Sequence, residues 1–151
     1  METDYAWAAG FFDGEGNVCF SDSDKKRSPR IFAQIAQVNR SPLDRFAKIV
    51  GVGNVTGPYT PKTKNSRPYY KWAIHDYSSV LYLYSKIETW LDEDKTRDFK
   101  YAIGKYEEWI EAGLCINGHQ MVMNDQGKFK CHECYVIGGK RAMEKRWGVR
   151  Q

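Results

Sequence analysis

The chain has 151 residues, of which 42% are hydrophobic, 15% aromatic and 28% charged, with a formal net charge of +4. This is the composition of a globular protein with one ordinary core, and it excludes a disordered or fibrous chain. No apolar run approaches the roughly 20 residues of a membrane-spanning helix, and the first residues do not resemble a secretory leader. We therefore expect an intracellular protein with no membrane partner.

The first predicted helix runs from about Thr3 to Asp13. Ala6, Ala9, Gly10 and Asp13 recur at i, i+3, i+4 and i+7, which forms a stripe with little side-chain bulk. Gly10 lowers helix stability by about 1 kcal/mol relative to Ala, which indicates that its small size is used. We predict that the backbone of another helix packs closely against this stripe.

Two strands are predicted next, over residues 17–21 and from about 30 to 38, joined by a polar, basic loop. In the first strand Val18 and Phe20 alternate with polar positions and are predicted to face the core. Both faces of the second strand mix apolar and polar residues, so its orientation stays open. Ser41-Pro42 then predicts a helix start, with a capping hydroxyl before a proline, and Gly51 predicts the end of that helix.

The rest of the first 112 residues repeats this order. Strands are predicted near 54–56 and over 69–76, Asp76 is predicted to cap a helix that runs to about Thr89, and a further helix is predicted over 94–112. The sequence of helix, two strands, helix, two strands and helices indicates an α+β fold. We expect the helices to cover one face of a sheet whose other face is polar and basic.

Basic residues concentrate in three segments, around residues 25–30, 62–71 and 128–151. Clustered Lys and Arg suit a polyanion, because each phosphate contact releases condensed counterions and raises affinity. For any single cluster taken alone a solvated loop is the better explanation, so the indication of a polyanionic partner depends on the three clusters together.

The segment Ala8-Ala9-Gly10-Phe11-Phe12-Asp13-Gly14-Glu15-Gly16 resembles the motif of the LAGLIDADG homing endonucleases. The αββαββ order matches that family, and the resemblance covers about residues 3 to 112. It implies a curved antiparallel sheet that binds double-stranded DNA and a site that hydrolyses phosphodiester bonds with Mg²⁺. Ala8 replaces the usual large aliphatic first residue.

The resemblance also implies roles for individual residues. Glu15 corresponds to the metal-binding acid, and a hard oxygen ligand of this kind suits Mg²⁺. Asp13 is assigned to the same metal site through its backbone carbonyl, or to a structural role at the helix junction. Lys95 is the candidate that would offset developing charge, and Gln37 is the candidate polar residue of the second strand, in competition with Asn39 and Arg40.

A single motif supplies one acid per chain, so the resemblance implies a homodimer with the first helix on the two-fold axis. Ala6, Ala9, Gly10 and Asp13 are the predicted interface residues. An isologous dimer presents the same surface twice, which predicts a palindromic or pseudopalindromic target.

Candidate DNA contacts lie on the predicted sheet and in the basic segments, because a two-stranded ribbon fits the major groove, where base edges differ in their donors and acceptors. They are Asn17, Ser21, Arg27, Arg30, Gln34, Arg40, Asn54, Lys62, Lys64, Arg67, Tyr69, Lys71, Lys140 and Arg141.

A second motif follows residue 112. Cys115 and His119, then Cys131 and Cys134, provide two pairs of ligands that suit tetrahedral Zn²⁺. This segment resembles the small zinc ribbons appended to nucleic-acid enzymes, and four protein ligands imply a structural ion. We therefore predict two domains, 1–112 and 113–151, the second with a basic arm that contacts phosphates.

Two other functions remain open from the sequence. A noncatalytic DNA-binding regulator with the same fold would have no need of Glu15 beside a phosphate. An RNA maturase is compatible with the resemblance, whereas the single motif favours a symmetric duplex.

Overall fold

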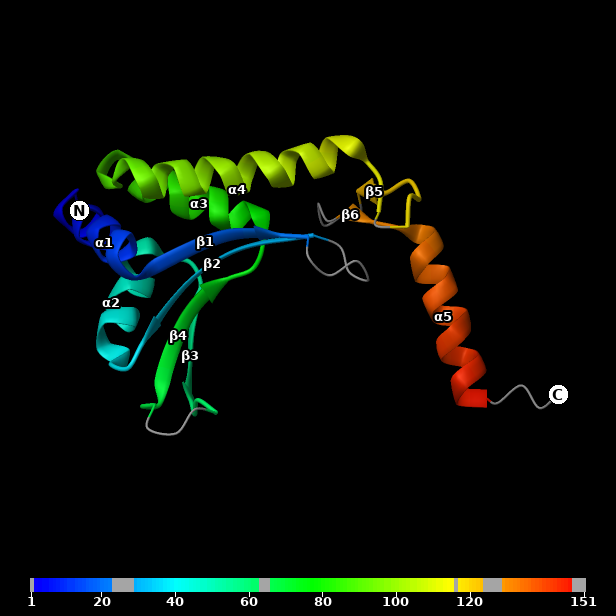
Figure 1. Ribbon diagram of the computed structural model, residues 1–151, viewed down its shortest axis with the longest axis horizontal. Coiled ribbons are helices and arrows are strands. Elements are labelled where there is room, and N and C mark those ends of the chain that lie inside the picture. The colour runs from blue at the N-terminus through cyan, green and yellow to red at the C-terminus, as the bar shows by residue number, and fades with distance from the viewer. Residues whose placement is uncertain (1, 23–28, 63–65, 116, 124–128, 148–151) are drawn as a thin grey trace. The chain divides into compact units, whose positions relative to one another are not determined.

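The computed structural model of this chain describes residues 2–22, 29–62, 66–115, 117–123 and 129–147, with backbone alone for 123, 129 and 140–147. Two compact units are present (Figure 1): the first consists of Met1–Ser21 and Pro29–Tyr106, and the second is formed by the chain from Glu107 onward. The long helix α4 (Glu93–Ala112) contains this boundary. The division at 112/113 predicted from the sequence falls at the end of the same helix.

The first unit is a four-stranded antiparallel sheet with helices packed on one face. Strand order across the sheet is β1-β2-β4-β3, so each helix-strand-strand repeat contributes one hairpin. The predicted α+β fold with an αββαββα order is confirmed. Its elements before α4 are α1 (Glu2–Glu15), β1 (Gly16–Ser21), β2 (Arg30–Gln37), α2 (Arg40–Val50), β3 (Asn54–Tyr59), β4 (Tyr69–Ile74), α3 (Tyr77–Ile87) and a 3₁₀ turn, η1 (Glu88–Trp90).

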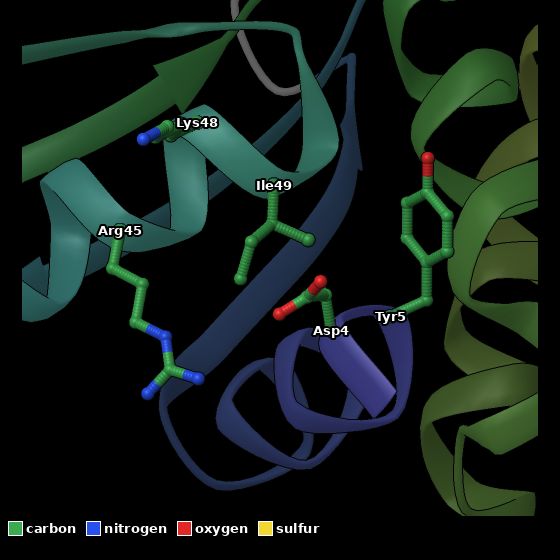
Figure 2. Close-up of a pocket in the computed structure, with 5 residues that line it drawn as sticks. All are labelled: Asp4, Tyr5, Arg45, Lys48 and Ile49. Carbon is green, nitrogen blue, oxygen red and sulfur yellow. The ribbon is translucent and has the colours of Figure 1, made fainter. Parts of the chain in front are cut away.

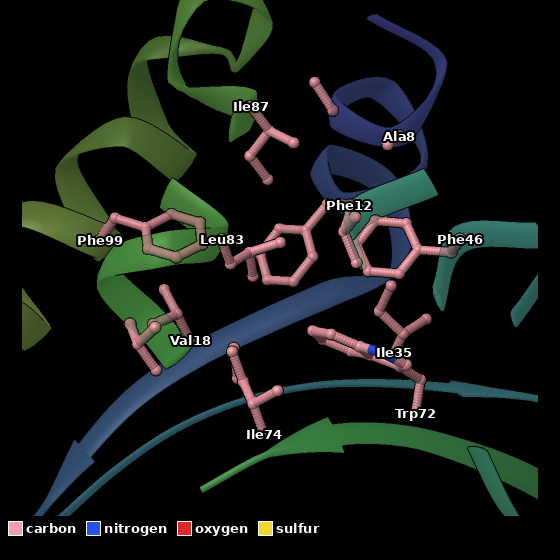
Figure 3. Close-up of a cluster of buried hydrophobic side chains, with 14 of the residues drawn as sticks. Ala8, Phe12, Val18, Ile35, Phe46, Trp72, Ile74, Leu83, Ile87 and Phe99 are labelled. Atoms are coloured by element: carbon pink, nitrogen blue, oxygen red, sulfur yellow. The ribbon is translucent and has the colours of Figure 1, made fainter. Parts of the chain in front are cut away.

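The core lies between the helices and the sheet (Figure 3). Phe12 of α1, Phe46 of α2, Leu83 of α3 and Phe99 of α4 meet above the strands. The ring of Trp72 of β4 lies beneath Phe46, with the two ring centroids 4.8 Å apart. Each of these side chains is fully buried, so this layer supplies most of the hydrophobic stabilisation of the unit. The helices therefore cover one face of the sheet and leave the other open.

The sequence predicted which side of β1 faces the core, but it left the orientation of β2 open. Val18 is buried and Phe20 packs against the core, as predicted. In β2 the alternation is resolved by packing, because Ile31, Ala33 and Ile35 are buried and the residues between them are not.

The helix caps predicted from the sequence are confirmed at two helix ends and wrong at a third. Gly51 ends α2 in the left-handed region at φ 71°, and the carboxylate of Asp76 accepts a hydrogen bond from the amide of Ser79 at the start of α3. The predicted cap Ser41 is wrong. The side chain of Asn39 caps α2 by accepting a hydrogen bond from the Ser41 amide at 3.1 Å, because the helix begins earlier, at Arg40.

The second unit contains a short hairpin followed by a helix. Strands β5 (Val122–Met123) and β6 (Phe129–Lys130) pair antiparallel, and α5 (His132–Trp147) follows directly. An additional bridge joins Leu114 and Gln120. Among the described residues, no helix is long and apolar enough to cross a membrane.

Candidate functional site

The motif ends where α1 turns directly into β1. Gly16 begins the strand against the ring of Phe12, and a Cβ added there would lie 2.5 Å from that ring. Only glycine allows so close an approach, which brings the strand in immediately after the helix. Glu15, the last residue of α1, is exposed at this junction.

Two contacts join the beginning of α4 to the junction of α1 and β1. The Asp13 carboxylate accepts hydrogen bonds from the amide of Asp92, at 3.3 Å to each oxygen. The ammonium of Lys95 donates to the carbonyl oxygen of Gly16 at 2.8 Å. Lys95 is therefore brought to the motif from 79 residues away.

Asp92 was not among the residues selected from the sequence. Its carboxylate accepts a hydrogen bond from the Lys95 amide at 2.6 Å, and its own amide binds Asp13. It thus caps α4 and fixes the helix start against the motif. An Asp three residues before Lys95, ahead of a helical pattern, was the signal that could have revealed this cap.

The surroundings of Asp13 raise the pKa of its carboxyl group above the ordinary value. Partial burial raises the pKa of its carboxyl, the hydrogen bond from the Asp92 amide lowers it, the Asp92 charge raises it and the Lys95 charge lowers it, with a net increase. The Asp13 side chain thus has a structural partner within its own unit, which agrees with the structural role considered for it.

Gln37 is the last residue of β2 and pairs with Tyr70. It alternates with Ile31, Ala33 and Ile35, so the register places it on the helix-covered face. It lies at the end of the interior strand β2, two residues beyond the partner of Gly16. The competing Arg40 lies in the first turn of α2, where it pairs with Asp44 at 3.1 Å.

The open face of the sheet carries half of the residues predicted to contact DNA. The register aligns Asn17, Gln34 and Asn54 on this face, with Lys71 on the neighbouring line. Arg30 pairs with Ser21 at the far end of the first hairpin. Tyr69 is half-buried, and Lys62 and Arg67 are exposed in the β3–β4 connection.

Several predicted contacts do not lie on this face or cannot be described. Arg40 is on α2 instead of the sheet. Arg27 and Lys64 lie outside the described residues. Lys140 and Arg141 belong to α5, but their side chains lie outside the described part of the chain.

The predicted small stripe on α1 is exposed at only some of its positions. Gly10 is exposed, Ala6 is partly exposed, and a Cβ at Gly10 or Gly14 would meet no atom within 4 Å. The prediction that Ala9 lies in an interface with a second chain is wrong. Ala9 is 0% exposed, because α1 packs on its own sheet through Ala8, Ala9 and Phe12. The accessible stripe is therefore Ala6, Gly10 and Gly14.

The four predicted zinc ligands converge. The ligand atoms of Cys115, His119, Cys131 and Cys134 all lie within 4.8 Å of one another. Sγ of Cys115 and of Cys134 are 3.7 Å apart, and Nδ1 of His119 lies 3.6 Å from Sγ of Cys131. A tetrahedral zinc ion with ordinary bond lengths separates two sulfurs by about 3.8 Å and a sulfur from a nitrogen by about 3.6 Å, so the group fits this ion.

Backbone geometry holds the two ligand pairs. The amide of Asn117 donates to Sγ of Cys115 at 3.4 Å, and the amide of Cys134 donates to Sγ of Cys131 at 3.3 Å. Cys134 lies in the first turn of α5, so this unit uses a helix start for its second pair, in contrast to a ribbon built of strands alone. Such N–H···S contacts stabilise thiolates.

The thiols interact strongly with one another. Burial raises the pKa of Cys115, but hydrogen bonds from the amides of Asn117 and His119 and from Cys131 and Cys134 lower it to about 7. In Cys131 the hydrogen bond from the Cys134 amide lowers the pKa, whereas burial and the neighbouring thiols raise it, with a net increase. At least one thiolate is therefore available near neutral pH to begin binding a metal ion.

A depression of about 420 Å³ lies between α1 and α2 and is lined by Asp4, Tyr5, Arg45, Lys48 and Ile49 (Figure 2). Its α1 residues are at the beginning of the helix. Glu15 is at the other end, roughly 16 Å away at 1.5 Å per residue. The depression is therefore separate from the candidate chemical groups.

The fold and the α1–β1 junction define a class of protein: the chain has the fold of the LAGLIDADG homing endonucleases. Similar solved structures are I-CvuI with DNA and magnesium (20% identity, TM-score 0.56, covering 74% of this chain and 70% of that one) and an archaeal intron-encoded endonuclease, I-Vdi141I, with DNA (18%, 0.58, 78% and 76%). A third is the homing endonuclease I-TnaI (24%, 0.53, 72% and 74%).

A similarity in sequence is found to the intron-encoded RNA maturase bI4 of Saccharomyces cerevisiae. The two are 29% identical over 89 residues, which cover 57% of this chain and 13% of the maturase. The chain thus corresponds to a small part of that protein. No family model matches the sequence.

Proposed function

We propose that this protein is a site-specific endonuclease that hydrolyses double-stranded DNA as a homodimer with Mg²⁺. The observation that carries the proposal is the exposed Glu15 carboxylate at the end of α1, with the ammonium of Lys95 bound to the next residue. An acid and a cation at one surface point suit a phosphodiester, whose negative charge increases during hydrolysis. The solved structures with this fold that were crystallised with DNA support the same assignment.

Oxygen atoms at this junction suit Mg²⁺, which prefers hard ligands and retains several waters. Glu15 would hold the ion through its carboxylate. Asp13, whose carboxylate binds the Asp92 amide, would contribute through its backbone carbonyl. The ion would neutralise phosphate charge and lower the pKa of a water molecule.

Lys95 is proposed to stabilise charge at the reacting phosphate. Gln37, at the end of β2, is proposed as a further polar residue of the active site. Replacing Lys95 by Ala is expected to reduce the cleavage rate by about 10²- to 10³-fold, the usual loss for a group that stabilises developing charge. DNA affinity should change far less. Cleavage of a bound duplex under single-turnover conditions measures the effect.

The matched control for Lys95 is Lys100→Ala, which removes an exposed ammonium from the same helix. Cleavage by this variant should equal that of the wild type. Equal rates for Lys95→Ala and Lys100→Ala would remove Lys95 from the reaction.

The homodimer is proposed to form through Ala6, Gly10 and Gly14 of α1. Gly10→Leu should convert dimer to monomer without unfolding the chain, because its side chain enters open space in the single chain. Sedimentation velocity and thermal unfolding measure the two effects. A Gly10→Leu protein that remains dimeric would exclude this interface. Gly104→Leu in α4, where an added Cβ also meets no atom within 4 Å, is the control.

The DNA partner is proposed to lie on the open sheet face, with base contacts from Asn17, Gln34, Asn54 and Lys71. Arg30 and the exposed Lys62 and Arg67 are assigned to phosphates. Basic residues of this kind give binding a strong dependence on salt.

A second candidate, RNA maturation, is favoured by the similarity to the yeast maturase. Competition between duplex DNA and structured intron RNA for the full chain separates the two. Binding of duplex alone, with cleavage in Mg²⁺, supports the endonuclease. Preference for the RNA without cleavage of any duplex supports the maturase, and duplex binding without cleavage supports the noncatalytic regulator.

A further inference from the structure

The open face of the sheet is organised in lines that run across the strands. The register pairs Asn17 with Gln34, Gln34 with Ala73 and Ala73 with Asn54, which makes one continuous line through all four strands. Paired residues project from the same face of a sheet. Three carboxamides therefore lie on one line beside a single methyl group, and we call this the carboxamide row.

The next line toward the end of the first hairpin has different chemistry. Cys19 pairs with Phe32, and the Phe32 ring lies 6.3 Å from the ring of His75. Phe32 does not belong to the core cluster, although most other large aromatic residues of the unit pack against that cluster. We call Cys19 and Phe32 the apolar row, because it places a thiol and an aromatic ring on an otherwise polar face.

These two rows match different base edges in the major groove. A carboxamide offers a donor beside an acceptor, which pairs with both N6 and N7 of adenine, whereas guanine presents two acceptors. An apolar side chain such as Phe contacts the methyl group of thymine. A bidentate match of the carboxamide kind distinguishes the right base from a wrong one by about 5- to 150-fold, which corresponds to 1–3 kcal/mol.

We propose that each half of the target has an adenine opposite the carboxamide row, read by Gln34, and a thymine opposite the apolar row, read by Phe32. This inference rests on the proposed function. The rows are two residues apart along a strand, about 6.7 Å, which equals about two base-pair steps of 3.4 Å. Because β1 begins at Gly16, beside Glu15, the adenine lies nearer the cleavage site and the thymine about two base pairs further out.

A binding selection tests this assignment with the full, zinc-loaded chain. A library of randomised duplexes is selected in buffer without Mg²⁺. The recovered base frequencies are compared for wild type, Gln34→Ala, Gln34→Lys, Phe32→Ala and Phe32→Leu. The exposed Lys48→Ala variant on α2 is the control and should leave the profile unchanged. Thermal unfolding confirms that each variant is folded.

Gln34→Ala should abolish an adenine preference of at least about 5-fold, and Gln34→Lys should replace adenine by guanine at the same position, since Lys pairs with guanine acceptors. Phe32→Ala should abolish a thymine preference about two base pairs away, and Phe32→Leu should retain part of it. A Gln34-sensitive position that prefers another base, or an unchanged profile for Phe32→Ala, would overturn the assignment. If no duplex is enriched by the wild type, the proposed DNA-binding function itself fails.

Discussion

Glu15→Gln should lower Mg²⁺-dependent DNA cleavage by about 10³-fold, the upper end of the loss seen when one group that stabilises charge at a reacting centre is removed. The amide has the shape of the carboxylate but neither its negative charge nor its affinity for hard cations. Glu15 is exposed, so the free energy of unfolding should remain within about 0.5 kcal/mol of wild type.

The measurement is the single-turnover cleavage rate on a duplex recovered by binding selection, with the affinity for that duplex measured in parallel. Affinity in the absence of Mg²⁺ should be retained. Glu88→Gln, which removes an exposed acid from the 3₁₀ turn η1 on the helical side, is the matched control and should cleave as the wild type does. If Glu15→Gln cleaves at the control rate, Glu15 is not at the reacting centre.

Removal of zinc is expected to unfold the second unit and leave the first intact. The described part of the second unit has little core of its own, with buried Cys115 and Met121 as its apolar centre. In small zinc-dependent peptides the binding of a structural zinc ion contributes about 10–16 kcal/mol to the free energy of folding. The first unit has its own core between the helices and the sheet. Chelation should therefore expose the chain after Ala112 to protease while residues before Tyr106 stay protected.

Elemental analysis should find one zinc ion per chain. Cys115→Ser and Cys131→Ser should both lose the ion and become protease-sensitive without chelator. Cys19→Ser is the control, since Cys19 lies in β1 and outside the four-ligand group, and it should retain zinc. Full protease resistance of the metal-free wild type would show that the unit does not depend on the ion.

Affinity for zinc should fall as the pH is lowered from 7.5 to 6. Zinc binds thiolates, and with the pKa of Cys115 lowered to about 7 this thiol is largely ionised at pH 7.5 and largely protonated at pH 6. Bound protons compete with the metal below that pKa. Chelator competition at a series of pH values measures the effect, and an affinity independent of pH would exclude thiolate ligation.

The sequence by itself determined the elements and the types of chemistry. Period-two alternation identified β1, Gly51 identified the end of α2, and the spacing of four Cys and His residues identified the metal-binding group, because these signals depend on neighbours within a few residues. The motif around Glu15 indicated the family fold, which the structure confirms.

The tertiary structure decided which distant residues meet and which faces are covered. Lys95 reaches Gly16 across 79 residues, and Asp92 joins the two segments by capping α4 and binding Asp13. Ala9 is small enough for a helix–helix interface, but it is part of the core. The face of α1 that carries it packs against the sheet of the same chain.

The alignment of side chains across the sheet was likewise beyond the sequence. Ile31, Ala33 and Ile35 are buried on the helix-covered face of β2. Gln34 and Phe32 alternate with them and therefore lie on the open face. A shift of one residue in register would reverse both faces, and the register is set by the packing of four strands against the helices, not by any one segment.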